Sequence, residues 1–374
     1  MQYTEYELGE LLPFEQPTAY IVKSTDYSDA YATPVLTAGK SFILGKTNET
    51  DGIFDQLPVI IFDDFTTATQ FVNFRFKVKS SAMKILHINT DLVIPKYIFY
   101  RLQIIQFDHS THKRYWIQSY SKIKVLIPPL DEQFRIVARI EELFSELDKA
   151  VDTLKTTKEQ LEVYRQAVLK DAFSDFEKKD SIRNLTMVVT SGSRGWAKYY
   201  SNSGALFVRI GNLTHSGIDI DFRDIQHITP PDNAEGVRTR LQPNDVLVSI
   251  TADLGSIGFV SEKVEEAYIN QHIALVRFQN PVQGRFMAWY LRSEYGQKDL
   301  LKNKRGGGKL GLGLDDIRDT PVPIVDDITA TEIVDKVEEQ LSVCDSIEKT
   351  VDTALAQADA MRQSILKQAF EGKI

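Results

Sequence analysis

Residues 131–173 read DEQFRIVARIEELFSELDKAVDTLKTTKEQLEVYRQAVLKDAF, a stretch without glycine or proline. A stretch of this length without helix breakers predicts one helix of about 65 Å, at 1.5 Å per residue. Apolar side chains recur in it every seven residues, at Ile140, Leu147, Leu154, Leu161 and Val168. A second heptad row falls between them, at Ile136, Leu143, Ala150, Thr157 and Tyr164. Two rows in seven predict the narrow apolar seam of a coiled coil.

The same pattern returns 197 residues later, in a second stretch (327–370) that lacks glycine and proline. Its first heptad row is Val337, Cys344, Val351, Ala358 and Ile365, and its second is Ile333, Gln340, Ile347, Ala354 and Met361. The match needs no gap, and the helices end alike, in AVLKDAF and SILKQAF. We therefore expect two helices of one design that pair with each other in antiparallel fashion. The alternative is two ordinary amphipathic helices packed on separate globular cores.

The segments outside the helices mix strand and helix patterns. Strand-like runs include LPVIIF (57–62), FRFKV (74–78), ALFVRI (205–210), DVLVSI (245–250) and IALVRF (273–278). We therefore expect mixed α/β or α+β domains, in two copies, separated by two long antiparallel coiled-coil helices in a pseudo-twofold internal repeat. The expected parts are a first domain at 1–125, a first connector helix at 126–179, a second domain at 180–321 and a second connector helix at 322–374.

Composition and charge restrict the function only loosely. The chain has no apolar run long enough to cross a membrane and a single cysteine, and its acidic, polar N-terminal residues lead us to expect no signal peptide, so we expect a cytoplasmic protein. The net charge of −8 at first argues against nucleic acid. However, residues 126–179 contribute −3 and residues 322–374 contribute −6, whereas 1–125 is neutral and 180–321 carries +1. The charge of the two domains therefore permits DNA binding.

No complete catalytic motif is present in the sequence. GGGK (306–309) differs from a phosphate loop because Asn303 replaces its first glycine and Leu310 its Ser or Thr. LGLGL (310–314) lacks the third glycine of a dinucleotide fingerprint, and the six histidines show no metal-ligand spacing. Asp63 and Asp64 form a carboxylate pair at a strand end, but no lysine at nuclease spacing accompanies them. We therefore expect a structural role for this pair.

Three loops instead combine basic, aromatic and hydroxyl residues: TSGSRGWAKYY (190–200), KNKRGGGK (302–309) and HKRYW (112–116). Glycine allows the backbone to approach a phosphate, Lys and Arg neutralise it, and Arg reads guanine through two hydrogen bonds. A single loop of this kind is usually a solvated turn. Because all three lie in the near-neutral domains and none lies in the helices, together they favour nucleic-acid binding. Arg194 is the best candidate for a base contact.

The layout of the whole chain resembles that of the specificity subunits of type I restriction-modification systems. The stretches that carry the resemblance in the first domain are TPVLTAGKSF (33–42), PVIIFDDFTT (58–67) and SSAMKIL (80–86). In the second domain they are SGSRGW (191–196), DVLVSITADLG (245–255) and NQHIAL (270–275). IPPLDEQ (127–133) opens a connector, and KQAFEGK (367–373) ends one. One departure is PIVDDITA (323–330), where the family shows a Pro-Leu-x-Glu-Gln sequence at the end that meets a partner.

The resemblance implies a protein that is not itself an enzyme. It implies that each domain reads one half of a bipartite double-stranded DNA site and that the helices set the gap. Two copies of an adenine methyltransferase subunit would dock on the helices, and restriction translocase-nuclease subunits would join them. S-adenosylmethionine, ATP and magnesium are expected on those partners and no cofactor or metal on this chain. The candidate DNA contacts are Lys40, Ser41, Thr66, Thr67, His112, Lys113, Arg114, Tyr115, Ser193, Arg194, Trp196, Lys198, Tyr199, Lys302, Lys304, Arg305 and Lys309.

Two other interpretations stay open. The chain could be the specificity component of a related system in which nuclease and methylase are fused in one partner. It could also be a coiled-coil scaffold that holds two protein-binding domains. The salt dependence of DNA affinity separates the scaffold from the DNA reader, because a scaffold shows none. A self-sufficient DNA enzyme is disfavoured by the incomplete motifs.

Overall fold

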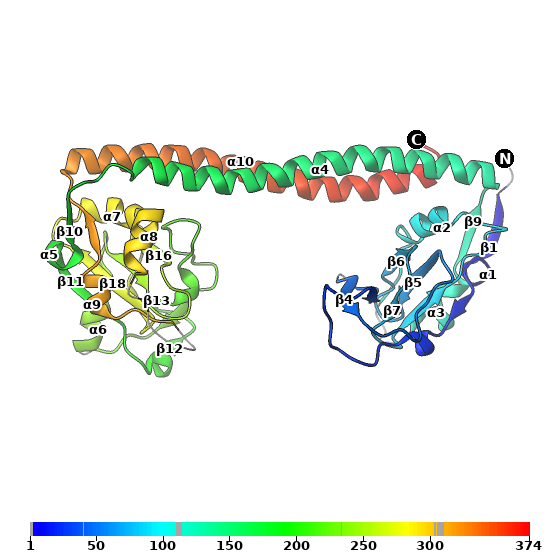
Figure 1. The fold of residues 1–374 in the computed structure, drawn as a ribbon, viewed down its shortest axis with the longest axis horizontal. Helices are drawn as coiled ribbons and strands as arrows, with labels where there is room; N and C mark the ends of the chain where they lie inside the picture. Colours follow the sequence, from blue (N-terminus) through cyan, green and yellow to red (C-terminus); the bar gives the residue numbers. More distant parts are fainter. Residues whose placement is uncertain (1–2, 40, 110–113, 233, 303, 305–309) are drawn as a thin grey trace. The chain divides into compact units, whose positions relative to one another are not determined.

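The computed structural model describes residues 3–39, 41–109, 114–232, 234–302, 304 and 310–374. The chain divides into two compact units, one formed by residues 1–154 with 353–374 and the other by residues 155–352. Helices α4 (Leu130–Ala172) and α10 (Asp327–Phe370) each contribute a segment to both units (Figure 1).

The globular domain of the first unit is built on the antiparallel sheet β2-β8-β5-β6 and the sheet β4-β3-β7. Strand β1 pairs with β9, so the domain closes directly before α4 begins. The elements are β1 Thr4–Glu7, α1 Leu8–Leu11, β2 Phe14–Glu15, β3 Thr33–Leu36, β4 Ile43–Thr47, β5 Val59–Asp63, β6 Thr69–Val72, β7 Lys77–Val78, β8 Met83–Leu86, α2 Pro95–Leu102, α3 Tyr115–Gln118 and β9 Lys124–Ile127.

The globular domain of the second unit is built on the sheets β11-β18-β15-β16 and β12-β14-β13-β17, and β10 pairs with β19 before α10. The elements are β10 Lys179–Ser181, α5 Ile182–Leu185, β11 Thr186–Ser191, β12 Tyr200–Ser201, β13 Ala205–Val208, β14 Gln226–Ile228, α6 Ala234–Thr239, β15 Val246–Ser249, β16 Ile257–Phe259, β17 Ala267–Ile269, β18 Ile273–Phe278, α7 Gln283–Arg292, α8 Glu294–Leu300, α9 Leu314–Arg318 and β19 Pro321–Pro323.

The two domains share one topology in one chain order. The sheet order β2-β8-β5-β6 corresponds strand by strand to β11-β18-β15-β16. Strand β3 pairs with β4 antiparallel and with β7 parallel, and β13 pairs with β14 and β17 in the same two ways. The closing pair β1-β9 recurs as β10-β19. The internal repeat that the helices predict therefore extends through the domains, and the expected fold class is confirmed.

Within each unit the segments of α4 and α10 run antiparallel. In the first unit Arg362 forms an ion pair with Asp148, and its guanidinium lies 4.6 Å from the ring centre of Phe144. In the second unit Arg165 lies 2.7 Å from Asp345. Arg362 and Asp345 follow Arg165 and Asp148 by the same 197 residues. One Arg–Asp pair is thus repeated in each unit, as a self-complementary antiparallel pairing requires.

The first heptad row is buried as expected. Seven of its ten residues are at most 9% exposed, and Leu147, Leu154 and Ile365 are partly buried. The prediction for the second row is wrong by one residue, because Tyr164 and Met361 are 48% and 53% exposed. The row that faces the seam is Val137, Phe144, Val151, Lys158, Arg165, Val334, Leu341, Glu348, Leu355 and Arg362. An apolar pattern does not reveal this row, because several of its members are charged. These side chains pack their aliphatic parts at the seam and form ion pairs between the helices.

One glutamate in each unit ties the domain to the helices. Glu141 of α4 forms an ion pair with Lys96 and accepts a hydrogen bond from the Tyr100 hydroxyl, both on α2. Glu338, which follows Glu141 by 197 residues, accepts from the indole N–H of Trp289 on α7 at 2.8 Å. The paired helices and the domain therefore share one packed interface within each unit, which orients the loops at the other end of the domain.

The sequence 323–330, which departs from the family pattern, gives the second connector helix a different set of contacts at its start from those of the first. In the first unit the buried Gln133 accepts a hydrogen bond from the N–H of Ile94 at 2.8 Å and donates to the carbonyl of Pro128 at 2.9 Å. Ala330 stands at the equivalent position of α10. There Asp327 instead accepts a hydrogen bond from Asn280 at 2.6 Å.

Candidate nucleic-acid interface

Asp64 joins three chain segments at the base of the β5–β6 hairpin. Its N–H donates to the carbonyl of Ala82 at 3.0 Å, and its own carbonyl accepts from the N–H of Tyr115 at 2.9 Å. Its carboxylate accepts from the N–H of Trp116 at 2.8 Å and lies 3.1 Å from the ammonium of Lys84. Both charged side chains are only 1% exposed. Asp64 therefore holds the hairpin, the turn before β8 and the end of the 112–116 loop together.

Residues 64–67 form the tip of this hairpin. Asp63 caps it, because its carboxylate accepts hydrogen bonds from the N–H groups of Phe65 and Thr66 at 2.9 and 2.8 Å. The structural role that we expected for Asp63 and Asp64 is thus confirmed. Thr67 has a φ of +56°, and its hydroxyl oxygen lies 2.9 Å from Nε2 of His109. The exposed tip is therefore tied to His109, which precedes the 112–116 loop in the chain.

The second domain repeats this junction with different side chains. The N–H of Ile250 donates to the carbonyl of His272, and its carbonyl accepts from the N–H of Leu312, both at 2.9 Å. By strand register, Ile250 stands where the first domain has Asp64, and Ala274 where it has Lys84. An apolar pair thus replaces the buried ion pair, while the two backbone hydrogen bonds, which we call the backbone frame, are kept.

The tip on this frame is two residues longer, at 250–255. Backbone bonds close it between Ser249 and Ser256, as they do between Asp63 and Ala68 in the first domain. Nδ1 of His272 lies 2.5 Å from the hydroxyl oxygen of Thr251. Equal frames with unequal tips are typical of binding loops carried by a rigid scaffold.

His215 makes two polar contacts at this tip that do not form a catalytic relay. Its Nε2 lies 2.7 Å from Asp253 and 3.1 Å from the hydroxyl of Ser256. The hydrogen bond from His215 lowers the pKa of Asp253 below its usual value. A Ser-His-Asp relay needs the serine and the carboxylate on opposite ring nitrogens, whereas here both contact the same one.

The 190–200 loop passes directly beside the same junction. A Cβ on Gly192 would lie 2.2 Å from the carbonyl oxygen of Ile269, so this backbone packs against the segment that leads into His272. Arg238 holds the loop from the other side, because its guanidinium donates to the carbonyl of Ser191 at 2.6 Å and to the hydroxyl of Ser193 at 2.8 Å. The structure therefore brings this loop, the 250–255 tip and the backbone of Leu312 together.

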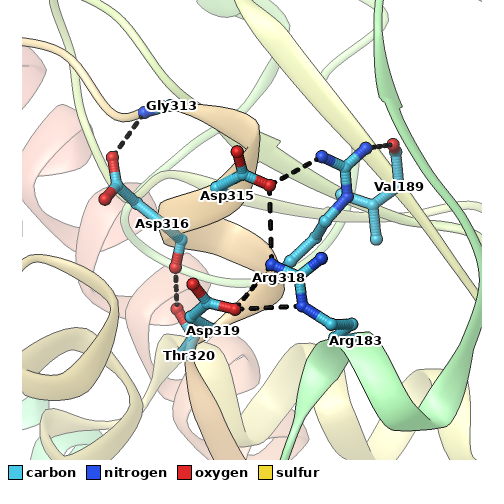
Figure 2. A network of polar contacts seen from close by, with 8 residues as sticks. All are labelled: Arg183, Val189, Gly313, Asp315, Asp316, Arg318, Asp319 and Thr320. Atoms are coloured by element: carbon cyan, nitrogen blue, oxygen red, sulfur yellow. Dashed lines mark hydrogen bonds and ion pairs between the residues drawn. The ribbon is translucent and has the colours of Figure 1, made fainter.

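Helix α9 is tied to strand β11 and to α5 by a network of polar contacts (Figure 2). Arg318 donates to the carbonyl of Val189 on β11 at 2.8 Å and to Asp315 at 3.0 Å. Arg183 reaches across from α5 to Asp319 at 2.7 Å. Because β11 leads into the 190–200 loop, this network fixes the strand from which that loop begins.

The predicted DNA contacts differ in accessibility. Lys40, His112, Lys113, Arg305 and Lys309 lie outside the described residues. The exposed ones are Ser41, Thr66, Arg114, Arg194, Lys198, Lys302 and Lys304, and the partly exposed ones are Thr67, Ser193 and Tyr199. Tyr115 and Trp196 are a correction to our expectation, because they are 4% and 3% exposed. They anchor their loops: Tyr115 contacts Phe107, and Trp196 stacks on Phe207 with ring centres 5.3 Å apart.

The sequence reasoning missed the polar residues in and around both tips: His109, His215, Thr251, Gln271 and His272. Gln271 and His272 stood in a stretch that carried the family resemblance, but the search favoured basic and aromatic residues. In the described part of the chain, no cluster of His, Cys, Asp and Glu could hold a metal ion. No described helix is long and apolar enough to span a bilayer.

The fold and loops define a class of protein in which two domains of one topology present variable loops on a duplicated helical support. No protein-family model matches the chain. It is 45% identical over 174 residues to the type I restriction enzyme EcoR124I/EcoR124II specificity subunit of Escherichia coli, covering 43% of each chain. It is 26% identical over 281 residues to the EcoBI specificity subunit of Escherichia coli, covering 66% of this chain and 58% of that protein. The chain is a homologue of type I restriction enzyme specificity subunits, and the matches span roughly half of the relatives' length.

Solved structures support the same fold over the whole chain. A chain from a type I restriction-modification system, solved to explain complex assembly and conformational transition, matches with a TM-score of 0.73 at 16% identity, covering 100% of this chain and 98% of that one. The HsdS subunit from Thermoanaerobacter tengcongensis matches with a TM-score of 0.51 at 16% identity, covering 100% and 97%.

Proposed function

We propose that this chain is the DNA sequence-specificity subunit of a type I restriction-modification complex, in which each domain reads one half of a bipartite double-stranded site. The observation that carries the proposal is that the backbone hydrogen bonds around Asp64 in the first domain recur around Ile250 in the second. These equivalent bonds hold a different hairpin tip in each domain. Homology to specificity subunits supports it.

The exposed cations of the three basic loops fit phosphate contacts. Within the described part of the chain, the side chains of Arg114, Arg194, Lys302 and Lys304 form no ion pair with a carboxylate, and all four are exposed. By contrast, Arg183 and Arg223, elsewhere on the second domain, are paired with aspartates. Exposed cations without a carboxylate partner among the described residues favour a polyanionic partner.

We also propose that each unit docks one adenine methyltransferase subunit on the flank of its helix pair, and that restriction translocase-nuclease subunits join this core. The second heptad row predicted from the sequence, which lies beside the seam rather than in it, forms this flank. It comprises Leu143, Ala150, Ala354 and Met361 in the first unit and Thr157, Tyr164, Gln340 and Ile347 in the second. The two sets are related by the 197-residue offset, so two identical partners fit them. S-adenosylmethionine, ATP and magnesium belong to those partners in this proposal, and the complex is cytoplasmic.

The docking proposal predicts a change in stoichiometry. Replacing Tyr164 with Glu adds a charge to the flank of the second unit only, so one of the two methyltransferase subunits is expected to bind at least tenfold more weakly. Sedimentation of the assembled complex measures the ratio. Val163→Glu is the matched control, because Val163 is 71% exposed on the adjacent helix face. A Tyr164→Glu complex that keeps two tightly bound subunits would contradict the proposal.

Domain replacement tests the proposed function itself. Because β10 and β19 bring both ends of the second domain together, residues 180–321 can be exchanged for the matching domain of another specificity subunit. We expect the exchange to change one half of the methylated sequence and to leave the other half and the gap unchanged. Mapping of methylated adenines measures this. A change in both halves would contradict independent reading, and DNA affinity that is insensitive to salt would favour the scaffold instead.

A further inference from the structure

The tip of each domain carries a threonine whose hydroxyl contacts a histidine. In the first domain, Nε2 of His109 lies 2.9 Å from the hydroxyl oxygen of Thr67 and 3.1 Å from the carbonyl oxygen of Thr66. In the second domain, Nδ1 of His272 lies 2.5 Å from the hydroxyl oxygen of Thr251. The two histidines come from different segments of their domains, so this contact is not a simple consequence of the shared topology.

The neighbours of each histidine decide which ring nitrogen carries the proton. A carbonyl oxygen only accepts, so the contact with Thr66 requires Nε2 of His109 to be protonated. In the second domain, the amide nitrogen of Gln271 lies 2.8 Å from Nε2 of His272. An amide nitrogen only donates, so Nε2 accepts and the proton of the neutral ring sits on Nδ1. In both domains the histidine therefore donates to the threonine.

A threonine hydroxyl that accepts from a histidine has one hydrogen left to give. An isolated hydroxyl either donates or accepts and distinguishes bases poorly. With its lone pair engaged by an imidazole N–H, the hydroxyl of Thr67 or Thr251 is set as a donor toward a ligand. Thr67 and Thr251 are partly exposed, so this hydrogen is within reach of a bound molecule.

We infer that Thr67 and Thr251 each read one base position as fixed hydrogen-bond donors, with His109, His272 and Gln271 as positioning residues. This inference rests on the proposed function and deepens it. The major-groove atoms that suit a donor are O6 and N7 of guanine, O4 of thymine and N7 of adenine, whereas the amino groups of adenine and cytosine cannot accept from it. Each threonine acts in its own half-site.

The test is selection of bound sequences from a pool of random double-stranded DNA by the full chain. Thr67→Val removes the hydroxyl at nearly constant shape and is expected to lower the preference at one base position of one half-site about tenfold. Thr251→Val is expected to do the same in the other half-site, so each variant controls for the other. Thr67→Ser and Thr251→Ser keep the donor and should keep the preference. Thr350→Val, on the exposed face of α10, should change nothing.

The positioning role of His272 has its own readout. His272→Asp places an oxygen that only accepts beside Thr251, so the hydroxyl turns inward and offers its lone pair to the base. The contacted base atom is then expected to change from an acceptor to an amino group, so a parental preference for guanine or thymine gives way to adenine or cytosine at that position. His272→Asn, which keeps an N–H donor, is expected to retain the parental base. A merely structural role of His272 would lower affinity without exchanging the base.

The outcomes separate the inference from the proposed function. If the parent selects no bipartite sequence from the pool, the proposed function fails. If the parent selects one and both valine variants select the same sequence with the same preference, the inference about the threonines is overturned while the proposed function stands. An unchanged melting temperature of each variant shows that a loss of preference does not come from unfolding.

Discussion

Removing one heptad from both helices, residues 151–157 of α4 and 351–357 of α10, is expected to bring the two half-sites about three base pairs closer. Seven residues shorten a helix by about 10 Å, and a base pair rises about 3.4 Å. The two heptads face each other under the antiparallel pairing seen in each unit, so both buried rows keep their register. The repeated pairs Arg165–Asp345 and Arg362–Asp148 lie outside the deleted segments. Mapping of methylated adenines measures the gap.

Deleting residues 151–157 alone is the control for this prediction. It moves one helix against the other by a heptad, so the Arg–Asp pair of one unit loses its partner and the variant should be unstable. A paired deletion that assembles, methylates and keeps the parental gap would show that the helices do not set the spacing.

Asp64→Ile is expected to destabilise the first domain by about 3–5 kcal/mol, because it leaves the buried ammonium of Lys84 without a counter-charge. The second domain shows that the same frame tolerates apolar side chains at both positions, Ile250 and Ala274. The double variant Asp64→Ile with Lys84→Met, which keeps most of the lysine's volume, is therefore expected to recover most of the lost stability.

Amide hydrogen exchange in β5 and β8 measures this effect, because it reports opening of the first domain separately from the second. Ile61→Val, a small apolar truncation in the same strand, is a control that should cost only about 1 kcal/mol. Equal protection of the Asp64→Ile variant and the parent would contradict the prediction, as would a double variant less stable than Asp64→Ile.

The sequence predicted the helices well because helical periodicity is local. The stretches without glycine and proline, 131–173 and 327–370, closely match α4 and α10. The second heptad row failed because a seam position was judged by polarity, whereas Arg165 and Lys158 reach carboxylates on the other helix. The strand order within the domains was out of reach, because pairs such as β1 with β9 join segments more than 100 residues apart.

The candidate interface, too, could be predicted from the sequence only in part. Basic loops stand out by composition, so the exposed cations were found. The partnership of Thr67 with His109 spans 42 residues and that of Thr251 with His272 spans 21, and no local pattern indicates either. Trp196 and Tyr115 were misjudged because an aromatic residue in a loop serves equally well as a contact or as an anchor.

The pairing of α4 with α10 also has a consequence for biosynthesis. Ile140 and Phe144 are buried with Leu366 and Ala369, which leave the ribosome more than 200 residues later. At a synthesis rate of 5–20 residues per second, this segment of α4 waits about 10–40 s for the segment of α10 that pairs with it. Phe370, which packs on Tyr97 with ring centres 5.2 Å apart, completes the first domain only then. The nascent chain therefore exposes an apolar helix face throughout the synthesis of the second domain, and a chaperone that covers it would protect the chain from aggregation.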